Sequence, residues 1–316
     1  MSAKSSILIT WRLPSAVLAR LEQVGTLDVH PGGTDLAHDE LCARVRGKQA
    51  LIPVITNRVD REVIDAGADL RIIANVAVGY NNIDVAHARA RGVVVTNTPD
   101  VLTEATADLT WALILAITRR VCEGDRLVRS GGWKGWTLDF MLGTELSGKQ
   151  LGIVGMGRIG QAVARRAGAF GMNVAFTSRR PISVEGATRL PLDSLLISSD
   201  VVSIHVPLSS DTRHLVDQRA LVRMKRSAYL VNTSRGPVVD EAALAWALRE
   251  RVISGAALDV YENEPLVHPD LLTLENVVLA PHLGSGTAET RTAMADLAAS
   301  NVIAVLTGKP PLTPVA

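Results

Sequence analysis

Short apolar runs alternate with stretches of helical periodicity along most of this chain, and that alternation restricts its fold more than any other feature. In the first part of the chain the runs are 6–10, 50–55, 71–74 and 93–96, each followed by a turn signal or a polar helical segment. Strands that alternate with helices form parallel sheets that helices cover on both faces. The pattern therefore predicts one doubly wound α/β domain here.

A long helix and a second series of strands follow. Thr103, Thr106 and Asp108 supply polar groups for the N-terminus of the helix, and apolar residues then recur at helical spacing as far as Ile117. The second series contains six apolar runs, which are residues 150–154, 173–177, 200–205, 228–232, 255–259 and 277–280. Six strands with crossover helices are the number expected for two mononucleotide-binding halves.

The end of the chain predicts one more amphipathic helix, over residues 287–306. We expect this helix to pack on the first domain, because the second sheet is already complete without it. The predicted outer domain therefore comprises residues 1–99 and 285–316, and a second domain, residues 100–284, is inserted into it. A chain of 316 residues is long enough for two such domains.

Composition excludes several classes of function. The chain has 33 Lys and Arg against 32 Asp and Glu, so its formal net charge of +1 gives no cationic excess for nucleic acid or an anionic membrane. The longest strongly apolar run, 109–118, is about half of the roughly 20 residues that a membrane span requires. We expect a cytoplasmic protein, because the N-terminus lacks the apolar segment and cleavage site of a signal peptide. Cys42 and Cys122 lie far apart in no metal-binding spacing, which predicts buried free thiols and no metal site.

A glycine-rich turn at residues 155–160 follows the first strand of the second series and opens an Ala-rich helix at 161–168. Gly155 suits a tight turn, Gly157 would let the backbone approach a pyrophosphate, and Gly160 would allow close packing of helix on strand. The amides at the start of the helix would then face the anion. A purely structural glycine turn is the alternative, but the strand–turn–helix context favours a dinucleotide site.

The next strand ends in Ser178-Arg179-Arg180, and this loop bears on which dinucleotide binds. A carboxylate about 20 residues beyond the glycine turn selects NAD through the ribose 2′-hydroxyl, whereas an arginine accommodates the 2′-phosphate of NADP. Here no carboxylate is present and two arginines take its place. The loop predicts a preference for NADPH over NADH, with a solvated basic turn as the alternative.

Three candidate catalytic residues, Arg235, Glu264 and His282, follow three successive predicted strands. An arginine there can bind a carboxylate through two parallel hydrogen bonds, and a histidine can act as a general acid near neutral pH. Taken singly, the three side chains also suit a surface cation, an acidic turn and a buried histidine. Their convergence at the carboxyl ends of parallel strands, where ligands bind in open sheets, favours a catalytic site. His205 ends another strand. Its side chain either borders the cofactor or only packs against neighbouring residues.

Ordered motifs identify a family. They lie at residues 75–84, 97–108, 155–160, 232–236, 258–265 and 281–285. With them, nearly the whole chain resembles the D-isomer-specific 2-hydroxyacid dehydrogenases, in particular the glyoxylate and hydroxypyruvate reductase branch. The resemblance implies a flavodoxin-like substrate domain and a Rossmann cofactor domain, both doubly wound parallel-sheet α/β structures. It also implies that Arg235, Glu264 and His282 form the catalytic set for hydride transfer to a small 2-oxo acid.

The same resemblance implies further site residues. Backbone amides would bind the substrate carboxylate, and the substrate-binding residues would be Val76, Ala77, Val78, Gly79, Arg235 and His282. The cofactor-binding residues would be Thr106, Gly155, Gly157, Arg158, Ile159, Gly160, Ser178, Arg179, Arg180, His205, Pro207, Thr212, Thr233, Ser234, Arg235, Asp259, His282 and Gly284. Trp133 and Trp136 resemble the arm that reaches the partner's active site in the family's homodimers.

Other activities share parts of this pattern. A phosphoglycerate or D-lactate dehydrogenase would have the same catalytic set, but it would typically carry an acidic residue near position 178. A phosphite-oxidising relative and a dinucleotide-sensing corepressor are further alternatives. The sequence leaves the substrate itself open between glyoxylate, hydroxypyruvate and similar acids, because the placement of Leu102, Phe140 and Met141 around the pocket is not fixed by their spacing.

Overall fold

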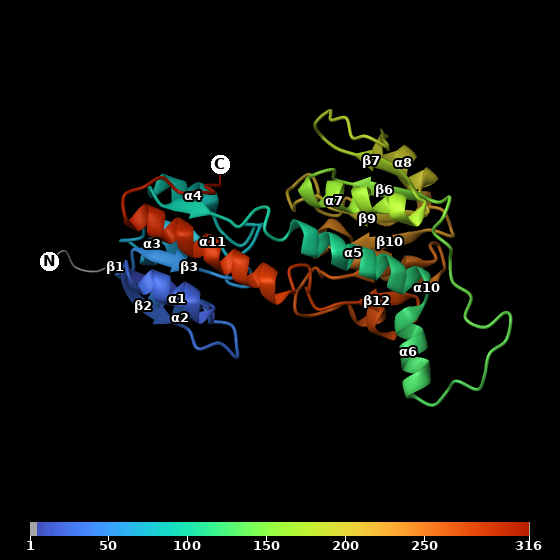
Figure 1. The fold of residues 1–316 in the computed structure, drawn as a ribbon, viewed down its shortest axis with the longest axis horizontal. Coiled ribbons are helices and arrows are strands. Elements are labelled where there is room, and N and C mark those ends of the chain that lie inside the picture. The colour runs from blue at the N-terminus through green and yellow to red at the C-terminus, as the bar shows by residue number, and fades with distance from the viewer. Residues whose placement is uncertain (1–4, 316) are drawn as a thin grey trace. The chain divides into compact units, whose positions relative to one another are not determined.

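The computed structural model describes residues 5–315, which form two compact units (Figure 1). The first unit runs to Leu102 and resumes at Thr287, and the second runs from Thr103 to Gly286. The boundaries predicted from sequence lie at 99/100 and 284/285. The chain thus leaves the first unit once, builds the whole second unit, and returns.

The first unit contains a five-stranded parallel sheet in the order β2-β1-β3-β4-β5, which is the flavodoxin-like order. Its strands are β1 (Ser5–Ile9), β2 (Gly25–Val29), β3 (Ala50–Ile52), β4 (Ile72–Ala74) and β5 (Val94–Thr96). The predicted fold class is confirmed, but the sequence prediction missed β2. This strand is at the sheet edge, pairs only with β1, and carries no continuous apolar run, since Thr26 is exposed.

Helices cover both faces of this sheet. On one face α1 (Ser15–Glu22) and α11 (Ala288–Leu306) pack on Ile7, Ile9 and Ile72. The helices on the other face are α2 (His38–Arg44), α3 (Arg61–Ala66) and α4 (Val85–Ala90). Figure 1 shows the last helix of the chain, in red, lying along the blue strands of the first unit. The two ends of the chain therefore build one core.

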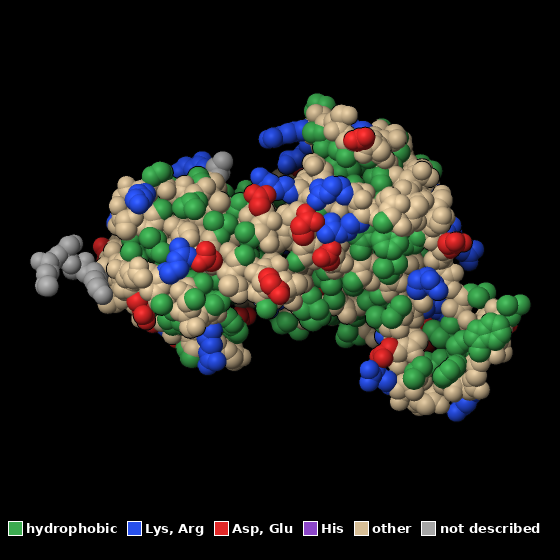
Figure 2. Space-filling model, viewed as in Figure 1, with side chains coloured by type: hydrophobic (Ala, Val, Ile, Leu, Met, Phe, Trp, Pro, Cys, Tyr) green, Lys and Arg blue, Asp and Glu red, His purple; other side chains and the backbone are tan. Residues whose placement is uncertain are grey.

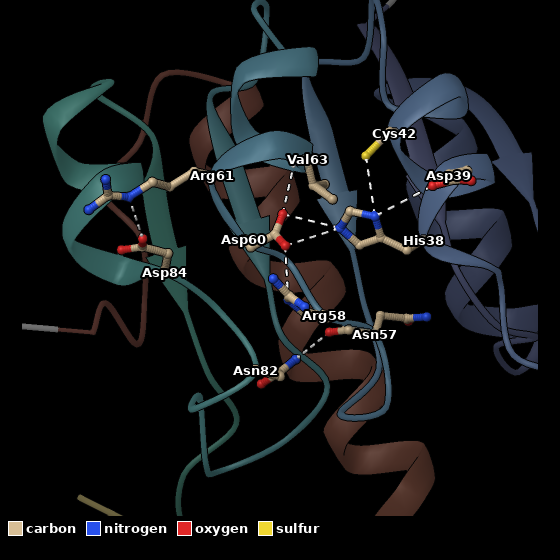
Figure 3. A network of polar contacts seen from close by, with 10 residues as sticks. All are labelled: His38, Asp39, Cys42, Asn57, Arg58, Asp60, Arg61, Val63, Asn82 and Asp84. Carbon is tan, nitrogen blue, oxygen red and sulfur yellow. Dashed lines mark hydrogen bonds and ion pairs between the residues drawn. The ribbon is translucent and has the colours of Figure 1, made fainter. Parts of the chain in front are cut away.

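A polar network ties α2 to the start of α3 (Figure 3). His38 Nε2 lies 3.1 Å from an Asp60 carboxylate oxygen, and Asp60 also accepts a hydrogen bond from the Val63 amide as the N-cap of α3. The Sγ of Cys42 lies 3.9 Å from His38 Nδ1. Cys42, His38 and Asp60 thus stand in the order of a nucleophile, a base and an acid. However, burial raises the pKa of the Cys42 thiol. A buried thiol with a raised pKa is inert, so the network is structural.

The second unit contains a seven-stranded parallel sheet in the order β12-β11-β10-β9-β6-β7-β8. Its strands are β6 (Gln150–Val154), β7 (Asn173–Thr177), β8 (Ala187–Arg189), β9 (Val201–Ile204), β10 (Tyr229–Asn232), β11 (Gly255–Leu258) and β12 (Val277–Leu279). Counted from β6, this is the Rossmann order 3-2-1-4-5-6, extended by one strand. The six predicted strands are confirmed, but the sheet has a seventh strand, β8, which the sequence prediction missed. That short edge strand exposes Thr188 and Arg189, so it shows no apolar run.

Helices again form two layers. On one face lie α5 (Thr103–Thr118) and α7 (Arg158–Ala167). On the other lie α8 (Leu192–Ser198), α9 (Gln218–Arg223) and α10 (Glu241–Arg249). Three short 3-10 helices, η1 (Gly168–Phe170), η2 (Gly236–Val238) and η3 (Pro269–Thr273), complete the unit. After α5 the chain turns at Arg120, which has a left-handed backbone conformation, into α6 (Val121–Arg129), which buries none of its residues. Among residues 5–315, no helix combines the length and apolar character needed to cross a bilayer.

Candidate active site

The carboxyl ends of the parallel strands of the second unit lie at one edge of its sheet, and most predicted site residues follow these ends. Gly155 follows β6, His205 follows β9, Thr233 follows β10 and Asp259 follows β11. His282 stands shortly after β12. One sheet edge therefore presents them together, as the topology predicts.

The glycine turn between β6 and α7 has the three environments that its spacing predicts. Gly155 has φ of +101°, and a Cβ there would lie 2.7 Å from the carbonyl carbon of His205. A Cβ on Gly160 would lie 2.2 Å from the Gly155 oxygen. Gly157, the N-cap of α7, would place its Cβ more than 4 Å from every other described atom outside its immediate chain neighbours. The turn is thus closed on its inner side and open where a pyrophosphate would face the amides of α7, so these residues fit a dinucleotide.

The loop after β7 places two exposed arginines, Arg179 and Arg180, beside the turn-forming Ser178. Ser178 Oγ donates a hydrogen bond to the Arg180 carbonyl (2.8 Å), and Arg189 on β8 donates to the Ser178 carbonyl (2.9 Å). Neither Arg179 nor Arg180 forms an ion pair with a carboxylate of residues 5–315. The loop therefore offers positive charge and no competing acid.

His282 and Glu264 form a hydrogen-bonded pair. The distance from His282 Nδ1 to Glu264 Oε2 is 2.7 Å, and each side chain is about one-third exposed (33% and 32%). The second oxygen, Glu264 Oε1, accepts a hydrogen bond from the Tyr261 amide (3.0 Å). Burial raises the pKa of Glu264, but the hydrogen bond with His282 and the charges nearby outweigh it, so the net pKa is lowered. Glu264 is therefore an ionised carboxylate that fixes Nδ1 and turns Nε2 away from itself.

Arg235 lies on the neighbouring loop, which is held by the side chain of Asn232. Asn232 Nδ2 donates to the Arg235 carbonyl (3.0 Å), and its Oδ1 accepts from the Ser234 amide (3.0 Å). Burial lowers the pKa of Arg235, while the negative charge of Glu264 opposes the shift. An arginine remains protonated under such conditions. The site thus holds a fixed positive charge close to the ionised Glu264.

Gly236 allows the loops that carry Arg235 and Glu264 to touch. A Cβ at this position would lie 1.8 Å from the carbonyl carbon of Tyr261 and 2.4 Å from the amide nitrogen of Glu262. No side chain fits in that space. Backbone of the loop that carries Arg235 therefore packs directly on backbone of the loop that carries Glu264.

Asp259 positions the His282 loop. Its two carboxylate oxygens accept hydrogen bonds from the amides of Leu283 (2.6 Å) and Gly284 (2.8 Å), and its carbonyl accepts from the His282 amide (2.9 Å). Thr106 Oγ1 donates to the Gly284 carbonyl (3.0 Å). Burial raises the pKa of Asp259, and the amide hydrogen bonds oppose this shift. Asp259 and Thr106, which the family resemblance assigns to cofactor binding, hence also hold the loop that carries His282.

The remaining predicted cofactor residues lie in the same loops. His205 Nε2 lies 2.8 Å from Ser203 Oγ, and burial lowers the pKa of His205 to about 3, so its ring is neutral at pH 7. Thr212 Oγ1 donates to the Pro207 carbonyl (2.6 Å). Arg158 and Ile159 begin α7, and Ser234 and Thr233 follow β10, where Thr233 Oγ1 lies 2.9 Å from Thr110 Oγ1.

The predicted substrate-binding residues Val76, Ala77, Val78 and Gly79 belong to the first unit, in the loop between β4 and α4. Trp133 and Trp136 belong to the second unit, in the loop after α6. Figure 2 shows apolar side chains gathered on this segment, where Trp136 is 76% exposed and Leu138 84%. Such an exposed apolar group is unusual for a surface that faces only water.

Sequence reasoning missed several residues that hold the site. Glu241, buried at the start of α10, accepts hydrogen bonds from the amides of Glu262 and His268, and Glu262 Oε1 accepts from the Glu241 amide (3.0 Å). His214 Nε2 lies 3.0 Å from the same oxygen. Acidic residues at a helix start are common on surfaces, so no sequence signal marks Glu241 as buried. Within the described chain, no three His, Cys, Asp or Glu side chains could hold a metal ion.

Comparison with known proteins identifies the family of this chain. Residues 111–284 match the family described as D-isomer specific 2-hydroxyacid dehydrogenase, NAD binding domain. A glyoxylate reductase from Thermococcus onnurineus (strain NA1) is 47% identical over 318 residues, which cover 98% of this chain and 95% of the relative. The chain belongs to the D-isomer specific 2-hydroxyacid dehydrogenases.

Two solved structures support this assignment over the whole length of the dehydrogenase. The TT0316 protein from Thermus thermophilus has a TM-score of 0.94 and 47% identity, covering 98% of this chain and 100% of that one. An NADPH-dependent glyoxylate/hydroxypyruvate reductase from Sinorhizobium meliloti, in complex with NADP and malonate, has a TM-score of 0.91 and 36% identity, covering 99% and 97%. This dehydrogenase is an oxidoreductase of 2-hydroxy acids with an NAD-binding domain, on the glyoxylate reductase branch of the family.

Proposed function

We propose that this dehydrogenase reduces a small 2-oxo acid, glyoxylate or hydroxypyruvate, to the 2-hydroxy acid and prefers NADPH to NADH. The observation that carries the proposal is the arrangement of Arg235, Glu264 and His282 on adjacent loops at one sheet edge, with His282 Nδ1 held 2.7 Å from Glu264. We also propose that the first unit is the substrate domain and the second the cofactor domain.

Each catalytic residue has a distinct task in this proposal. The reduced nicotinamide, when bound, supplies the hydride to the carbonyl carbon. His282 donates a proton from Nε2 as negative charge develops on the carbonyl oxygen, because imidazole exchanges protons near neutral pH. Glu264 fixes the ring and stabilises its positive charge. Arg235 binds the substrate carboxylate and polarises the carbonyl.

Support for NADPH comes from the loop after β7, where Arg179 and Arg180 are exposed and no acid stands. The S. meliloti reductase named above is described as NADPH-dependent. The deciding measurement is kcat/KM for NADPH and for NADH with the same 2-oxo acid. We expect a higher value for NADPH, and a higher value for NADH would refute this part of the proposal.

The substrate part of the proposal is supported by relatives described as glyoxylate reductases or as a glyoxylate/hydroxypyruvate reductase. A steady-state screen of glyoxylate, hydroxypyruvate, pyruvate and phenylpyruvate with NADPH tests it. We expect the smaller acids to be reduced with the highest kcat/KM. Tight NADPH binding without turnover of any of these acids would instead favour a dinucleotide-sensing protein.

We further propose that the dehydrogenase is a homodimer whose interface includes the loop after α6. Support comes from the exposure of Trp133, Trp136 and Leu138, which a second copy of the chain would cover. Sedimentation equilibrium gives the mass directly. A mass of one chain at micromolar concentration would contradict the proposal.

A further inference from the structure

In the loop that follows β4, three successive carbonyl groups, those of residues 77–79, accept hydrogen bonds from other residues of the first unit. The Ala77 carbonyl accepts a hydrogen bond from the Thr98 amide (2.9 Å), and the Val78 carbonyl accepts from Asn97 Nδ2 (2.8 Å). The Gly79 carbonyl accepts from Asn75 Nδ2 (2.9 Å). Two of the three donors are side-chain amides, so the conformation of this loop depends on particular residues.

The N–H groups of the same loop are differently placed. The Val76 amide donates to the Pro53 carbonyl (3.0 Å), which continues the sheet pattern. The amides of Ala77, Val78 and Gly79 donate to no group within residues 5–315. Three consecutive amides that have no acceptor within residues 5–315, and whose carbonyls are already bonded, are donors that suit an anion.

Asn75 is locked in place by a second carboxamide. Its side chain is fully buried, its Nδ2 also donates to Asn82 Oδ1 (3.2 Å), and its Oδ1 accepts from Asn82 Nδ2 (3.3 Å). Asn82 Nδ2 donates further to the Asn57 carbonyl (3.1 Å), the contact drawn between these residues in Figure 3. The reciprocal pair thus clamps the loop on both sides, before Val76 and after Tyr80.

The surroundings of the loop are more polar than packing requires. Within the described chain, four buried side-chain polar atoms lack a hydrogen-bond partner, and three of them belong to Asn57, Thr96 and Thr98. Thr96 and Thr98 bond the loop through backbone groups, to Asn75 and Ala77. Because buried unpaired polar groups destabilise a fold, their concentration here indicates a region shaped by binding.

We propose that Asn75 and Asn97 are positioning residues, which hold the Gly79 and Val78 carbonyls inward so that the amides of residues 77–79 present a carboxylate-binding surface to the substrate. This inference rests on the proposed 2-oxo acid reductase function. It adds the two side chains on which the geometry of those amides depends.

The first test is Asn97→Ala, because Asn97 is only half-buried and its carboxamide makes one hydrogen bond to the loop. We expect KM for glyoxylate to rise about tenfold with kcat within about twofold and KM for NADPH unchanged, the signature of lost uniform binding. Asn97→Asp, which cannot donate to the Val78 carbonyl, should do the same or more. Asn75→Ser extends the test to the Gly79 carbonyl.

A matched control separates this role from general destabilisation. Asn276 also donates to two backbone carbonyls, those of Leu248 and Ser254, but it lies in the second unit. Asn276→Ala should lower Tm and leave KM for glyoxylate unchanged. If it raised that KM as much as Asn97→Ala does, the positioning role would be refuted.

A neutral substrate tests whether the effect concerns the carboxylate. Methyl glyoxylate keeps the reacting carbonyl and lacks the negative charge. We expect Asn97→Ala to lower kcat/KM about tenfold for glyoxylate and less than about twofold for the ester. Equal losses for both substrates would overturn the inference.

Direct binding distinguishes failure of this inference from failure of the proposed function. Oxamate, an unreactive analogue of a 2-oxo acid, is titrated by calorimetry into the cofactor-loaded wild type and Asn97→Ala. Weaker binding to the variant supports the inference even if the wild type turns over none of the 2-oxo acids tested. Equal affinity, or no binding to the wild type, overturns it.

Discussion

His282 is the residue on which the proposed chemistry depends most directly. His282→Asn removes the group that would protonate the carbonyl oxygen, and general acid catalysis contributes about 10²–10⁴-fold to a rate. We expect kcat to fall within about that range while NADPH affinity, measured by quenching of tryptophan fluorescence, stays within about twofold. His87→Asn is a suitable control, because His87 also pairs with a carboxylate, Asp65, but lies in α4 of the first unit. A His282→Asn enzyme as active as the wild type would exclude the acid role.

His205 makes stability depend on pH. Its pKa is about 3 in the folded protein, because burial disfavours the charged ring, against about 6.5 in an unfolded chain. Because the pKa is lower in the folded protein than in the unfolded chain, protonation of His205 favours the unfolded chain. The contribution of the neutral ring to the free energy of unfolding is therefore complete above pH 6.5 and is lost as the pH falls from 6.5 toward 3. At pH 5 the loss should be roughly 2 kcal/mol.

Urea unfolding of the cofactor-free protein at pH 7 and pH 5 measures this effect. His205→Asn has no titrating ring, so we expect a smaller decrease in the free energy of unfolding between the two pH values than in the wild type. Identical decreases in wild type and variant would show that other groups account for the pH dependence.

At the scale of elements, the contact between the loops that carry Arg235 and Glu264 depends on Gly236. In Gly236→Ala the new Cβ would overlap the Tyr261 backbone, so the loop of Glu264 must move away from that of Arg235. We expect kcat/KM to fall at least about 100-fold, since a displacement of about 1 Å at a catalytic group costs that much. The assay is steady-state reduction of glyoxylate, with circular dichroism to verify folding.

Gly168→Ala is the matched control for this substitution. Gly168 has an ordinary helical φ of −59°, and a Cβ there meets no atom within 4 Å outside its chain neighbours and its own helix. The change should leave kcat/KM unaltered and Tm equal or higher, because alanine restricts the unfolded chain. Equal activity of the two variants would mean that the loop contact has no part in catalysis.

Elements could be predicted from sequence where burial makes them apolar on both sides. The strands β6, β7, β9, β10 and β11 carry such runs and lie nearly at their predicted bounds. The edge strands β2 and β8 could not be predicted in this way, because exposed polar side chains interrupt their apolar runs, whereas the edge strands β5 and β12 are apolar and were predicted. The gathering of the candidate catalytic residues at one edge of the sheet could be predicted from its parallel topology. The packing of Gly236 on Tyr261 and the contact of buried Glu241 with Glu262 could not be predicted, because they join residues distant in sequence.

At the scale of the whole molecule, the loop after α6 connects the fold to its proposed assembly. Trp133 and Trp136 are 54% and 76% exposed, so the described chain leaves more than half of each residue uncovered. Burial of large apolar side chains supplies most of the free energy of association, and tryptophans often dominate it. The proposed dimer should therefore depend on these two residues more than on apolar residues exposed elsewhere.

Trp133→Ser with Trp136→Ser tests that dependence. We expect the double variant to dissociate at least about 100-fold more readily than the wild type, because each buried tryptophan at an interface is worth about 2 kcal/mol or more. Sedimentation velocity over a range of concentrations gives the dissociation constant. Leu266→Ser is the control, since Leu266 is 72% exposed but lies in the loop of Glu264 rather than after α6. Dissociation of the Leu266 variant alone, with a stable dimer in the tryptophan variant, would move the interface away from the α6 loop.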